Sequence, residues 1–467
     1  MNDLLKLTAC TVVERLRAGD LTPHDLLDAL ESRIAEVDGR VNALPTLCFE
    51  RARAHADELM ARDPADRGAL AGLPVAIKDL ADVAGVRTTL GSPLFADRVP
   101  ASSDILVECL EASGGNIYAK SNTPEFGAGA HTFNEVFGTT LNPWDRSRSA
   151  AGSSGGSAVA LATGMAWAAH GSDLGGSLRN PASFCGIVGL RPTPGRVAHT
   201  RTAKIDSLLS VEGPMARNVE DLALLLDAMA GAHPADPVSL PRDTSFLDTA
   251  RSGWRPRRVA VSRDLGITPV EPEIADIAMA AARRFEDAGV IVEEAHPDLG
   301  EAHECFQVLR ALSFAVSLGP VYEKHRDALK PEIVWNIEKG LALTAADIAR
   351  AEHQRSAMFH RGLAFFETYD LLLTPATVVA PFPVGQRYVE ECAGQRFGNY
   401  IEWLAIAYAV TLLAGPAISI PAGFTAGGLP VGLQMVAPPR ADGRLLAGAR
   451  ALEDILGLKD TVPMDPR

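Results

Sequence analysis

The sequence predicts an α/β protein in which a large, mixed and mostly twisted central β-sheet is covered by helices on both faces. Short apolar segments typical of strands alternate along the chain with longer segments of helical periodicity. No repeat of fixed period is present, which argues against solenoids and propellers. The chain has 467 residues, of which 47% are hydrophobic, and this is enough to bury a large core. Disorder is therefore excluded as the main state.

The N-terminal 65 residues are expected to form a helical segment. Thr22 is suited to cap a helix, Pro23 suits its first position, and Asp25 completes a capping box. After this segment we expect a strand at 73–80, a helix at 105–110 and a second strand at 116–120. A loop-rich stretch at 121–156 and a helix of small residues at 156–167 follow. A short strand and a glycine turn follow, within residues 168–177.

The second half of the chain continues the alternation. Thr344 with Asp347 predicts the start of a helix that runs to about residue 366. The other expected elements are strands at 259–262, 371–374 and 429–436 and a helix at 272–288. The loops at 233–245 and 381–396 are candidate linkers or lids, but neither is long enough to divide the chain. We therefore expect a single domain over residues 1–467, with a catalytic core at 66–457.

Composition excludes several classes of function. The formal net charge is −14, and no basic run is long enough to follow a nucleic-acid backbone, so we expect no nucleic-acid partner. The six cysteines are scattered without a C-x-x-C pair, which fits a reducing cytoplasm better than a disulfide framework or a zinc site. The uncharged stretches at 153–172 and 403–439 are interpreted as buried core, and we expect no membrane partner.

Lys78 is the first candidate for chemistry, because it lies in the apolar segment LPVAIKD. The chain has 36 arginines and only 8 lysines, so a lysine in this position is unusual. Burial disfavours the ammonium form and lowers the pKa of a lysine, as a general base near neutral pH requires. The alternative interpretation is a lysine that reaches solvent or pairs with Asp79.

The segment AGSSGGSAVA, residues 151–160, is the second candidate. Its glycines permit close backbone approach, and the helix after it offers free N–H groups. A phosphate-binding P-loop is excluded because no lysine follows the glycines. A nucleophile elbow with Ser154 as nucleophile and a simple capped turn both remain open. The polar residues before Gly152 argue against the elbow, which requires a preceding strand.

The segment GSDLGGSLRNPASFCG, residues 171–186, is the third candidate. Its consecutive small residues before Ser177 can aim several backbone N–H groups at one point, as in an oxyanion hole for acyl transfer. The alternative is a tight turn with Asp173 and Arg179 as a buried ion pair.

Together these three segments resemble the amidase signature family, which comprises serine hydrolases with a Ser–cis-Ser–Lys triad. Four further segments carry the resemblance: NPASFCGIVGLRPTPGRV, GPMARNVEDLALLLDAM, DLLLTPATVVAPFPVG and the region from GPAISIPAGF to GLPVGLQMVAP. The resemblance covers most of the chain from about residue 65 to 457. It implies the amidase signature fold.

The resemblance also implies roles for individual residues. Ser177 matches the nucleophile, Ser153 the bridging serine with a cis peptide bond, and Lys78 the general base. The positions that match the oxyanion donors are Leu174, Gly175, Gly176 and Ser177. Those that match supporting residues are Ser154, Asp173 and Arg179. The family lines its acyl pocket with a loop that corresponds here to Phe126, Gly127, Ala128 and Gly129. No cofactor and no metal are implied, and no metal-ligand motif is found in the sequence.

The resemblance implies an amide-bond hydrolase that acts on a small molecule through an acyl-enzyme. The aromatic and glycine-rich loop at 123–138 favours an apolar or aryl amide, with a carbamate (urethane) as a related possibility. The alternatives are a biuret- or urea-type amidohydrolase, a glutaminyl-tRNA amidotransferase A-like subunit, and an inactive binding relative. The sequence after Gly195 departs from the amidotransferase pattern, and Ala151 replaces a glycine that is usual in the family. A homodimer stays open as the oligomeric state.

Overall fold

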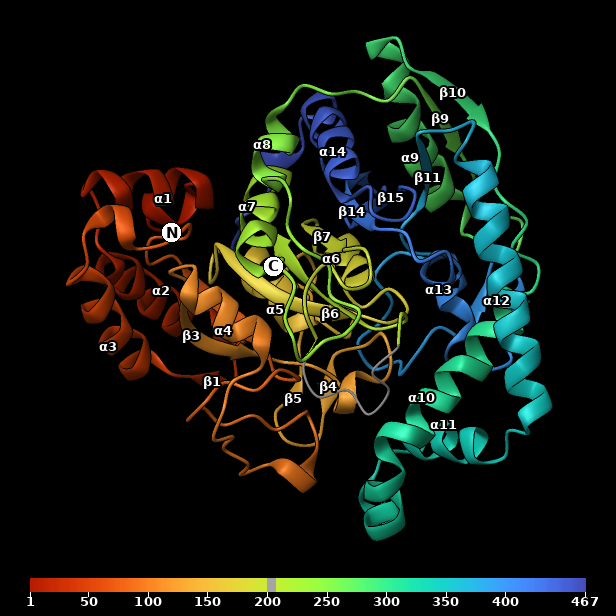
Figure 1. The fold of residues 1–467 in the computed structure, drawn as a ribbon, viewed down its shortest axis with the longest axis horizontal. Helices are drawn as coiled ribbons and strands as arrows, with labels where there is room; N and C mark the ends of the chain where they lie inside the picture. The colour runs from red at the N-terminus through yellow and green to blue at the C-terminus, as the bar shows by residue number, and fades with distance from the viewer. Residues whose placement is uncertain (200–206) are drawn as a thin grey trace.

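A mixed sheet of 11 strands runs through the computed structural model, which describes residues 1–199 and 207–467 (Figure 1). In spatial order its strands are β1 (Thr46–Leu47), β3 (Asn116–Ser121), β2 (Pro74–Lys78), β6 (Ala168–Asp173), β8 (Val211–Ala216), β7 (Val188–Arg191), β14 (Ala417–Phe424), β15 (Pro430–Val436), β11 (Leu371–Pro375), β9 (Arg258–Val261) and β10 (Ile291–Glu294). Two small ribbons pair β4 (Phe133–Asn134) with β5 (Gly138–Thr139) and β12 (Glu391–Cys392) with β13 (Gln395–Arg396).

Parallel and antiparallel pairings occur in the same sheet. Strand β2 is parallel to β3 and β6, and β9 is parallel to β10 and β11. The central strands β8, β7, β14 and β15 are joined by antiparallel pairings. The predicted mixed sheet is therefore confirmed.

Helices cover both sides of the sheet (Figure 1). They are α1 (Ala9–Ala18), α2 (Pro23–Val37), α3 (Phe49–Met60), α4 (Ile105–Ala112), α5 (Gly155–Ala162), α6 (Arg179–Cys185), α7 (Val219–Met229), α8 (Phe246–Arg251), α9 (Pro272–Arg283), α10 (Ala302–His325), α11 (Pro331–Leu341), α12 (Ala345–Phe365), α13 (Ala405–Leu412) and α14 (Asp442–Leu456).

The described residues form two large hydrophobic cores, and strand β11 contributes side chains to both. Leu371 and Leu373 pack into the core that contains side chains of α7 and α14, whereas Leu372 packs into the core formed by α10, α12 and α13. Successive side chains of a strand point to opposite faces, so a continuous apolar strand indicates burial on both faces.

The predicted capping boxes are confirmed at the starts of α2 and α12. Thr22 and Asp25 exchange hydrogen bonds at the first helix, and Thr344 and Asp347 do so at the second. The prediction of a helix over 156–167 is too long, because α5 ends at Ala162. The backbone turns there through Gly164, whose φ is +74°, before β6 begins.

The uncharged stretches at 153–172 and 403–439 fold as buried helices and strands of the two cores. Among the described residues one helix, Ala302–Ala328, is long and apolar enough to cross a membrane by length and composition alone. Its buried residues include Cys305, Phe306 and Leu309, which lie in the second core. Part of the segment after Gly195 that departs from the amidotransferase pattern lies outside the described residues.

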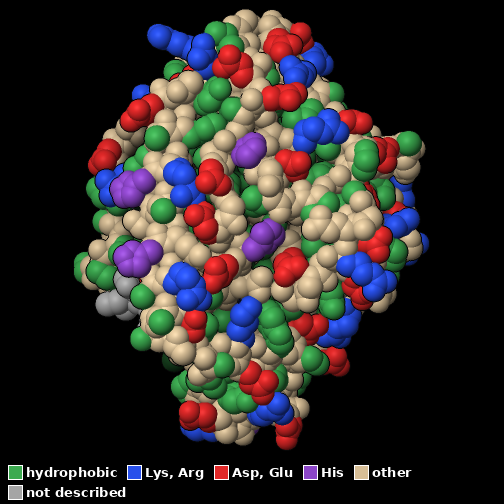
Figure 2. Space-filling model, turned by 90° about the vertical axis from the view of Figure 1, so that its right-hand side faces the viewer, with side chains coloured by type: hydrophobic (Ala, Val, Ile, Leu, Met, Phe, Trp, Pro, Cys, Tyr) green, Lys and Arg blue, Asp and Glu red, His purple; other side chains and the backbone are tan. Residues whose placement is uncertain are grey.

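Figure 2 shows the face at the right of Figure 1, where basic and acidic side chains are intermingled. Among the ion pairs between helices, Arg350 of α12 lies 2.8 Å from Glu304 of α10. Outside the grey residues, this face therefore lacks the stripe of one sign that binding along a phosphate backbone needs.

Candidate active site

The amine of Lys78 lies at the end of β2, fully buried and surrounded by hydroxyl groups. Its Nζ donates to Ser153 Oγ at 2.7 Å, to Ser154 Oγ at 2.9 Å and to Ser172 Oγ at 3.0 Å. An ammonium has three N–H donors, and each of them finds a neutral oxygen here. Three serines from two separate segments therefore meet at one lysine.

Burial lowers the pKa of Lys78 to about 7, although the charges of Glu212 and Asp173 act in the opposite direction. The interpretation that Lys78 pairs with Asp79 or reaches solvent is wrong. Asp79 lies 3.3 Å from the Nζ of Lys120 and accepts hydrogen bonds from Thr89. Among the described residues no carboxylate forms an ion pair with Lys78. The amine can therefore be neutral near pH 7.

The serine turn before α5 brings Ser153 and Ser154 to this lysine. The peptide bond between Gly152 and Ser153 is cis. The backbone N–H of Ser154 donates to the carbonyl of Ser177 at 3.2 Å, which joins the second and third candidate segments. Residues 142–151, all described, form turns and isolated bridges. A nucleophile elbow on Ser154 therefore lacks the strand that it needs.

Ser172 was not identified from the sequence as a site residue. It lies on β6, which runs parallel to β2 and pairs with it at Val75–Ala168 and Ala76–Ala169. Its backbone N–H donates to Ser154 Oγ at 3.3 Å, and its side chain accepts from Lys78. The only sequence signal for Ser172 was its position one residue before Asp173. Its approach to Lys78 depends on the pairing of two strands about 90 residues apart, which is not visible in a single sequence.

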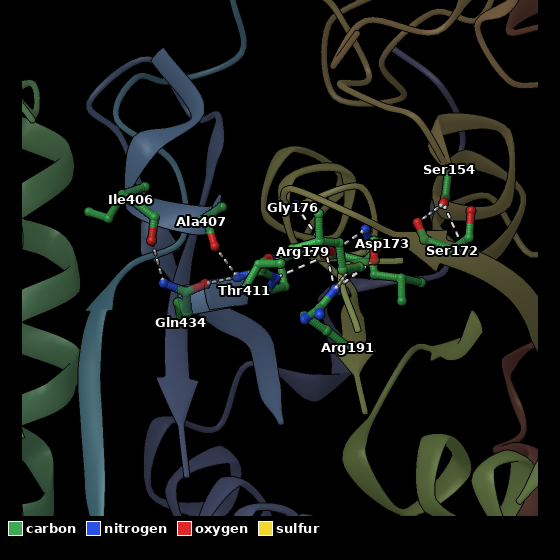
Figure 3. Close-up of polar contacts among 12 residues, drawn as sticks. Ser154, Ser172, Asp173, Gly176, Arg179, Arg191, Ile406, Ala407, Thr411 and Gln434 are labelled. Carbon is green, nitrogen blue, oxygen red and sulfur yellow. Dashed lines mark hydrogen bonds and ion pairs between the residues drawn. The ribbon is translucent and has the colours of Figure 1, made fainter. Parts of the chain in front are cut away.

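Asp173 and Arg179 form a buried ion pair that is part of a larger network (Figure 3). Two nitrogens of the guanidinium donate to the two carboxylate oxygens, at 3.0 and 2.9 Å. Arg191 approaches the same carboxylate at 3.5 Å. Burial opposes ionisation of Asp173, but the charge and hydrogen bonds of Arg179 outweigh it and hold the pKa well below its usual range.

The opposite side of Arg179 contacts the second half of the chain. Its Nη1 donates to Gln434 Oε1 at 2.5 Å and to the carbonyl of Ala407 at 2.9 Å. Figure 3 shows Arg179 between Asp173 and Gln434, and Gln434 in turn reaches the carbonyl of Ile406. The network therefore fixes the third candidate segment against β15 and α13.

The backbone N–H groups before Ser177 differ in availability. The N–H of Gly176 donates to Asp173 Oδ1 at 2.8 Å, so this predicted oxyanion donor is already occupied. A side chain at Gly176 would meet Asn180 and Ala407, and its φ of +113° also favours glycine. Within the described part of the chain, no acceptor takes the N–H of Leu174, Gly175 or Ser177, and these three residues line a cavity.

Two neighbouring cavities with shared lining residues lie beside these groups. The smaller has a volume of about 120 Å³ and is bordered by both Ser153 and Ser177. The larger, of about 520 Å³, adjoins it. The residues that border both cavities are Leu80, Phe126, Ser172, Leu174, Ser210 and Phe314.

Three of the four residues predicted to form the acyl pocket line the small cavity, and the fourth does not. Phe126, Gly127 and Gly129 line the small cavity, and a side chain at Gly127 would contact Ser153 Oγ at 3.4 Å. Ala128 is fully buried and does not line the cavity, and its carbonyl accepts a hydrogen bond from Lys330. Its side chain packs instead in a small hydrophobic cluster with Leu329, Ile333 and Ile337.

Walls of the small cavity that sequence reasoning missed come from α10 and from the region after β13. They are Phe306, Arg310, Phe314, Tyr400, Ile401 and Leu404. Among the described residues, no group of three or more His, Cys, Asp or Glu side chains is arranged to hold a metal ion.

Comparison with known proteins identifies the family. The family model described as Amidase matches residues 25–446. An acylamidase of Rhodococcus erythropolis is 34% identical over 465 residues, which cover 98% of this chain and 97% of the relative. The A-type subunit of the glutamyl-tRNA(Gln) amidotransferase of Alkaliphilus metalliredigens is 32% identical over 496 residues, covering 98% of this chain and 99% of that protein.

A solved structure of a bacterial aryl acylamidase of the amidase signature family superposes with a TM-score of 0.90 at 25% identity, covering 98% of this chain and 99% of that one. The chain belongs to the amidase family and has the amidase signature fold. It is an amide-hydrolysing enzyme.

We predict that Arg179→Met lowers the free energy of unfolding by about 3–5 kcal/mol, because it leaves the buried carboxylate of Asp173 without its main partner. The control is Arg263→Met, which removes an exposed ion pair with Asp276 and should cost less than about 1 kcal/mol. Denaturant titration of both variants measures the difference. Equal losses would show that the network around Arg179 is not a structural constraint.

Proposed function

We propose that the enzyme hydrolyses amides through an acyl-enzyme on Ser177, with Lys78 as general base and Ser153 as the proton relay between them. The observation that carries the proposal is the 2.7 Å contact from Lys78 Nζ to Ser153 Oγ, beside a cavity that also borders Ser177. A serine hydroxyl becomes an effective nucleophile only when an adjacent base removes its proton.

In the first step, the neutral amine of Lys78 accepts the proton of Ser153 Oγ as Ser153 accepts that of Ser177. The oxygen of Ser177 attacks the amide carbon and forms a C–O bond. The proton then returns along the same path to the amide nitrogen, the C–N bond breaks, and the amine leaves. Water attacks the ester by the same relay and releases the acid.

The developing negative charge on the carbonyl oxygen requires donors that are already in position. The N–H groups of Leu174, Gly175 and Ser177 are suited to this role, because these residues line the cavity and their N–H groups have no other acceptor among the described residues. Gly176 was expected to be a fourth oxyanion donor, but its N–H donates to the carboxylate of Asp173 and so stabilises the turn.

The substrate class that we propose is an apolar or aryl amide. The cavity walls include Phe126, Phe306 and Phe314. The acylamidase and the aryl acylamidase to which the chain is similar support this class. The similarity to the A-type amidotransferase subunit supports a second candidate, in which a partner chain is needed. Assays of the purified chain alone, without ATP, distinguish the two: hydrolysis by the chain alone supports the first candidate, and hydrolysis only with a partner chain present supports the second.

We predict that Ser177→Ala lowers kcat/KM on an aryl amide at least about 10⁴-fold, because it removes the nucleophile. Mass spectrometry of the wild-type enzyme, quenched during turnover, should find the acyl group on the peptide that contains residue 177. Ser153→Ala should lose less activity, since a water molecule can partly replace the relay. An acyl group on another serine, or full activity of Ser177→Ala, would contradict the proposal.

We predict that kcat/KM rises as the pH rises through about 7 and is level above it, because only the neutral form of Lys78 accepts a proton. Below that pKa the neutral fraction falls tenfold per pH unit. Lys78→Met should abolish this rise together with at least about 99% of the activity. The exposed control, Lys459→Met, should keep both. A rise near pH 6.5 that survives Lys78→Met would indicate a histidine base instead.

A further inference from the structure

Arg310 of α10 presents a positive charge to the same small cavity as Ser153 and Ser177. Its side chain is only 6% exposed. The guanidinium lies over the rings of Phe314 and Tyr400, 4.4 and 5.4 Å from their centroids. The aromatic rings therefore stabilise the guanidinium at this wall of the cavity.

The polar contacts of Arg310 are all to neutral groups. Its Nη2 donates to the hydroxyl of Tyr400 at 2.8 Å, and its Nη1 donates to the side-chain oxygen of Asn336. No described Asp or Glu forms an ion pair with it, and its Nε–H donates to no described residue. A buried charge is costly unless an opposite charge compensates it.

Other buried arginines show how this chain usually compensates such a charge. Arg179 and Arg191 approach Asp173, and Arg196 approaches Asp442. Arg217 forms no ion pair with a described carboxylate, but its guanidinium donates to the carbonyls of Leu5 and Leu7 at the end of a short helix. Unlike these four arginines, Arg310 lines the small cavity that Ser177 also borders.

Glu125 and Glu332, which like Arg310 act electrostatically on Lys330, have other partners. Glu125 accepts hydrogen bonds from Ser92 Oγ and from the backbone N–H of Lys330. Glu332 forms a two-oxygen ion pair with Arg387. The ammonium of Lys330, which contacts the carbonyl of Ala128, adds a second positive charge behind the loop that lines the cavity.

We propose that Arg310 is a specificity-determining residue that binds a carboxylate of the substrate, so that the preferred substrate is an aryl monoamide of a short dicarboxylic acid. This inference rests on the proposed function, because it takes the small cavity as the place of the acyl group. The compartment of about 120 Å³ suits the short part that stays bound to Ser177, and the larger one suits the amine that leaves. A guanidinium offers a planar pair of donors that matches a carboxylate.

The test compares two substrates that differ only at the end of the acyl chain: glutaryl-4-nitroanilide, which ends in a carboxylate, and pentanoyl-4-nitroanilide, which ends in a methyl group. A hydrogen-bonded charge contributes about 10- to 100-fold. We expect the wild-type kcat/KM to favour the glutaryl substrate by at least tenfold, mostly through KM. Equal values, or a preference for the pentanoyl substrate, would overturn the inference while the proposed hydrolysis stands.

Substitutions then assign the preference to Arg310. The ratio of the two kcat/KM values should fall at least tenfold in Arg310→Met, recover in part in Arg310→Lys, and stay unchanged in the exposed control Arg263→Met. A ratio unaffected by Arg310→Met would also overturn the inference.

Binding separates this inference from the proposed chemistry. Calorimetry with Ser177→Ala should find the glutaryl anilide bound at least tenfold more tightly than the pentanoyl anilide, whether or not the wild type turns them over. Equal affinities would refute the role of Arg310. Tighter glutaryl binding without wild-type turnover would instead count against the proposed function alone.

Discussion

The buried amine of Lys78 and the three hydroxyls around it form the interaction on which the site depends. A lysine in this position has lost its water, and it has gained three neutral oxygens within 3.0 Å. These oxygens accept from the three donors of the ammonium form but supply no full negative charge, so burial makes the neutral form accessible near pH 7. A carboxylate partner at the same distance would have kept the lysine protonated and unable to act as a base.

The sheet is the reason that these groups meet. Lys78 and Ser172 come from the neighbouring parallel strands β2 and β6, while Ser153 and Ser154 belong to the turn that begins α5. The network of Asp173, Arg179 and Gln434 then fixes the following turn against the second half of the sheet (Figure 3). Rigid elements thus hold each group of the proposed proton relay, as accurate proton transfer requires.

How far the sequence predicts this arrangement depends on how local the information is. The capping boxes at Thr22 and Thr344 are local, and both helices begin where predicted. The commitment of the Gly176 N–H to Asp173, three residues away, was missed because it depends on the exact shape of a turn. Ser172 and Arg310 join the site only through pairings and packing between distant segments, which a single sequence does not reveal. Helix α10, which carries Arg310, was not predicted although a helix is a local feature; it contains Pro320, a residue that usually ends or kinks a helix.

The most direct test of the account is to titrate Lys78 itself. The chain has only 8 lysines, so ¹³Cε-labelled lysine gives a simple NMR spectrum in which Lys78→Met identifies the signal of residue 78. This signal should titrate with a pKa near 7, well below the usual lysine value of about 10.4. A Lys78 signal that titrates near 10.4 would mean a permanently charged ammonium and would contradict its role as the general base.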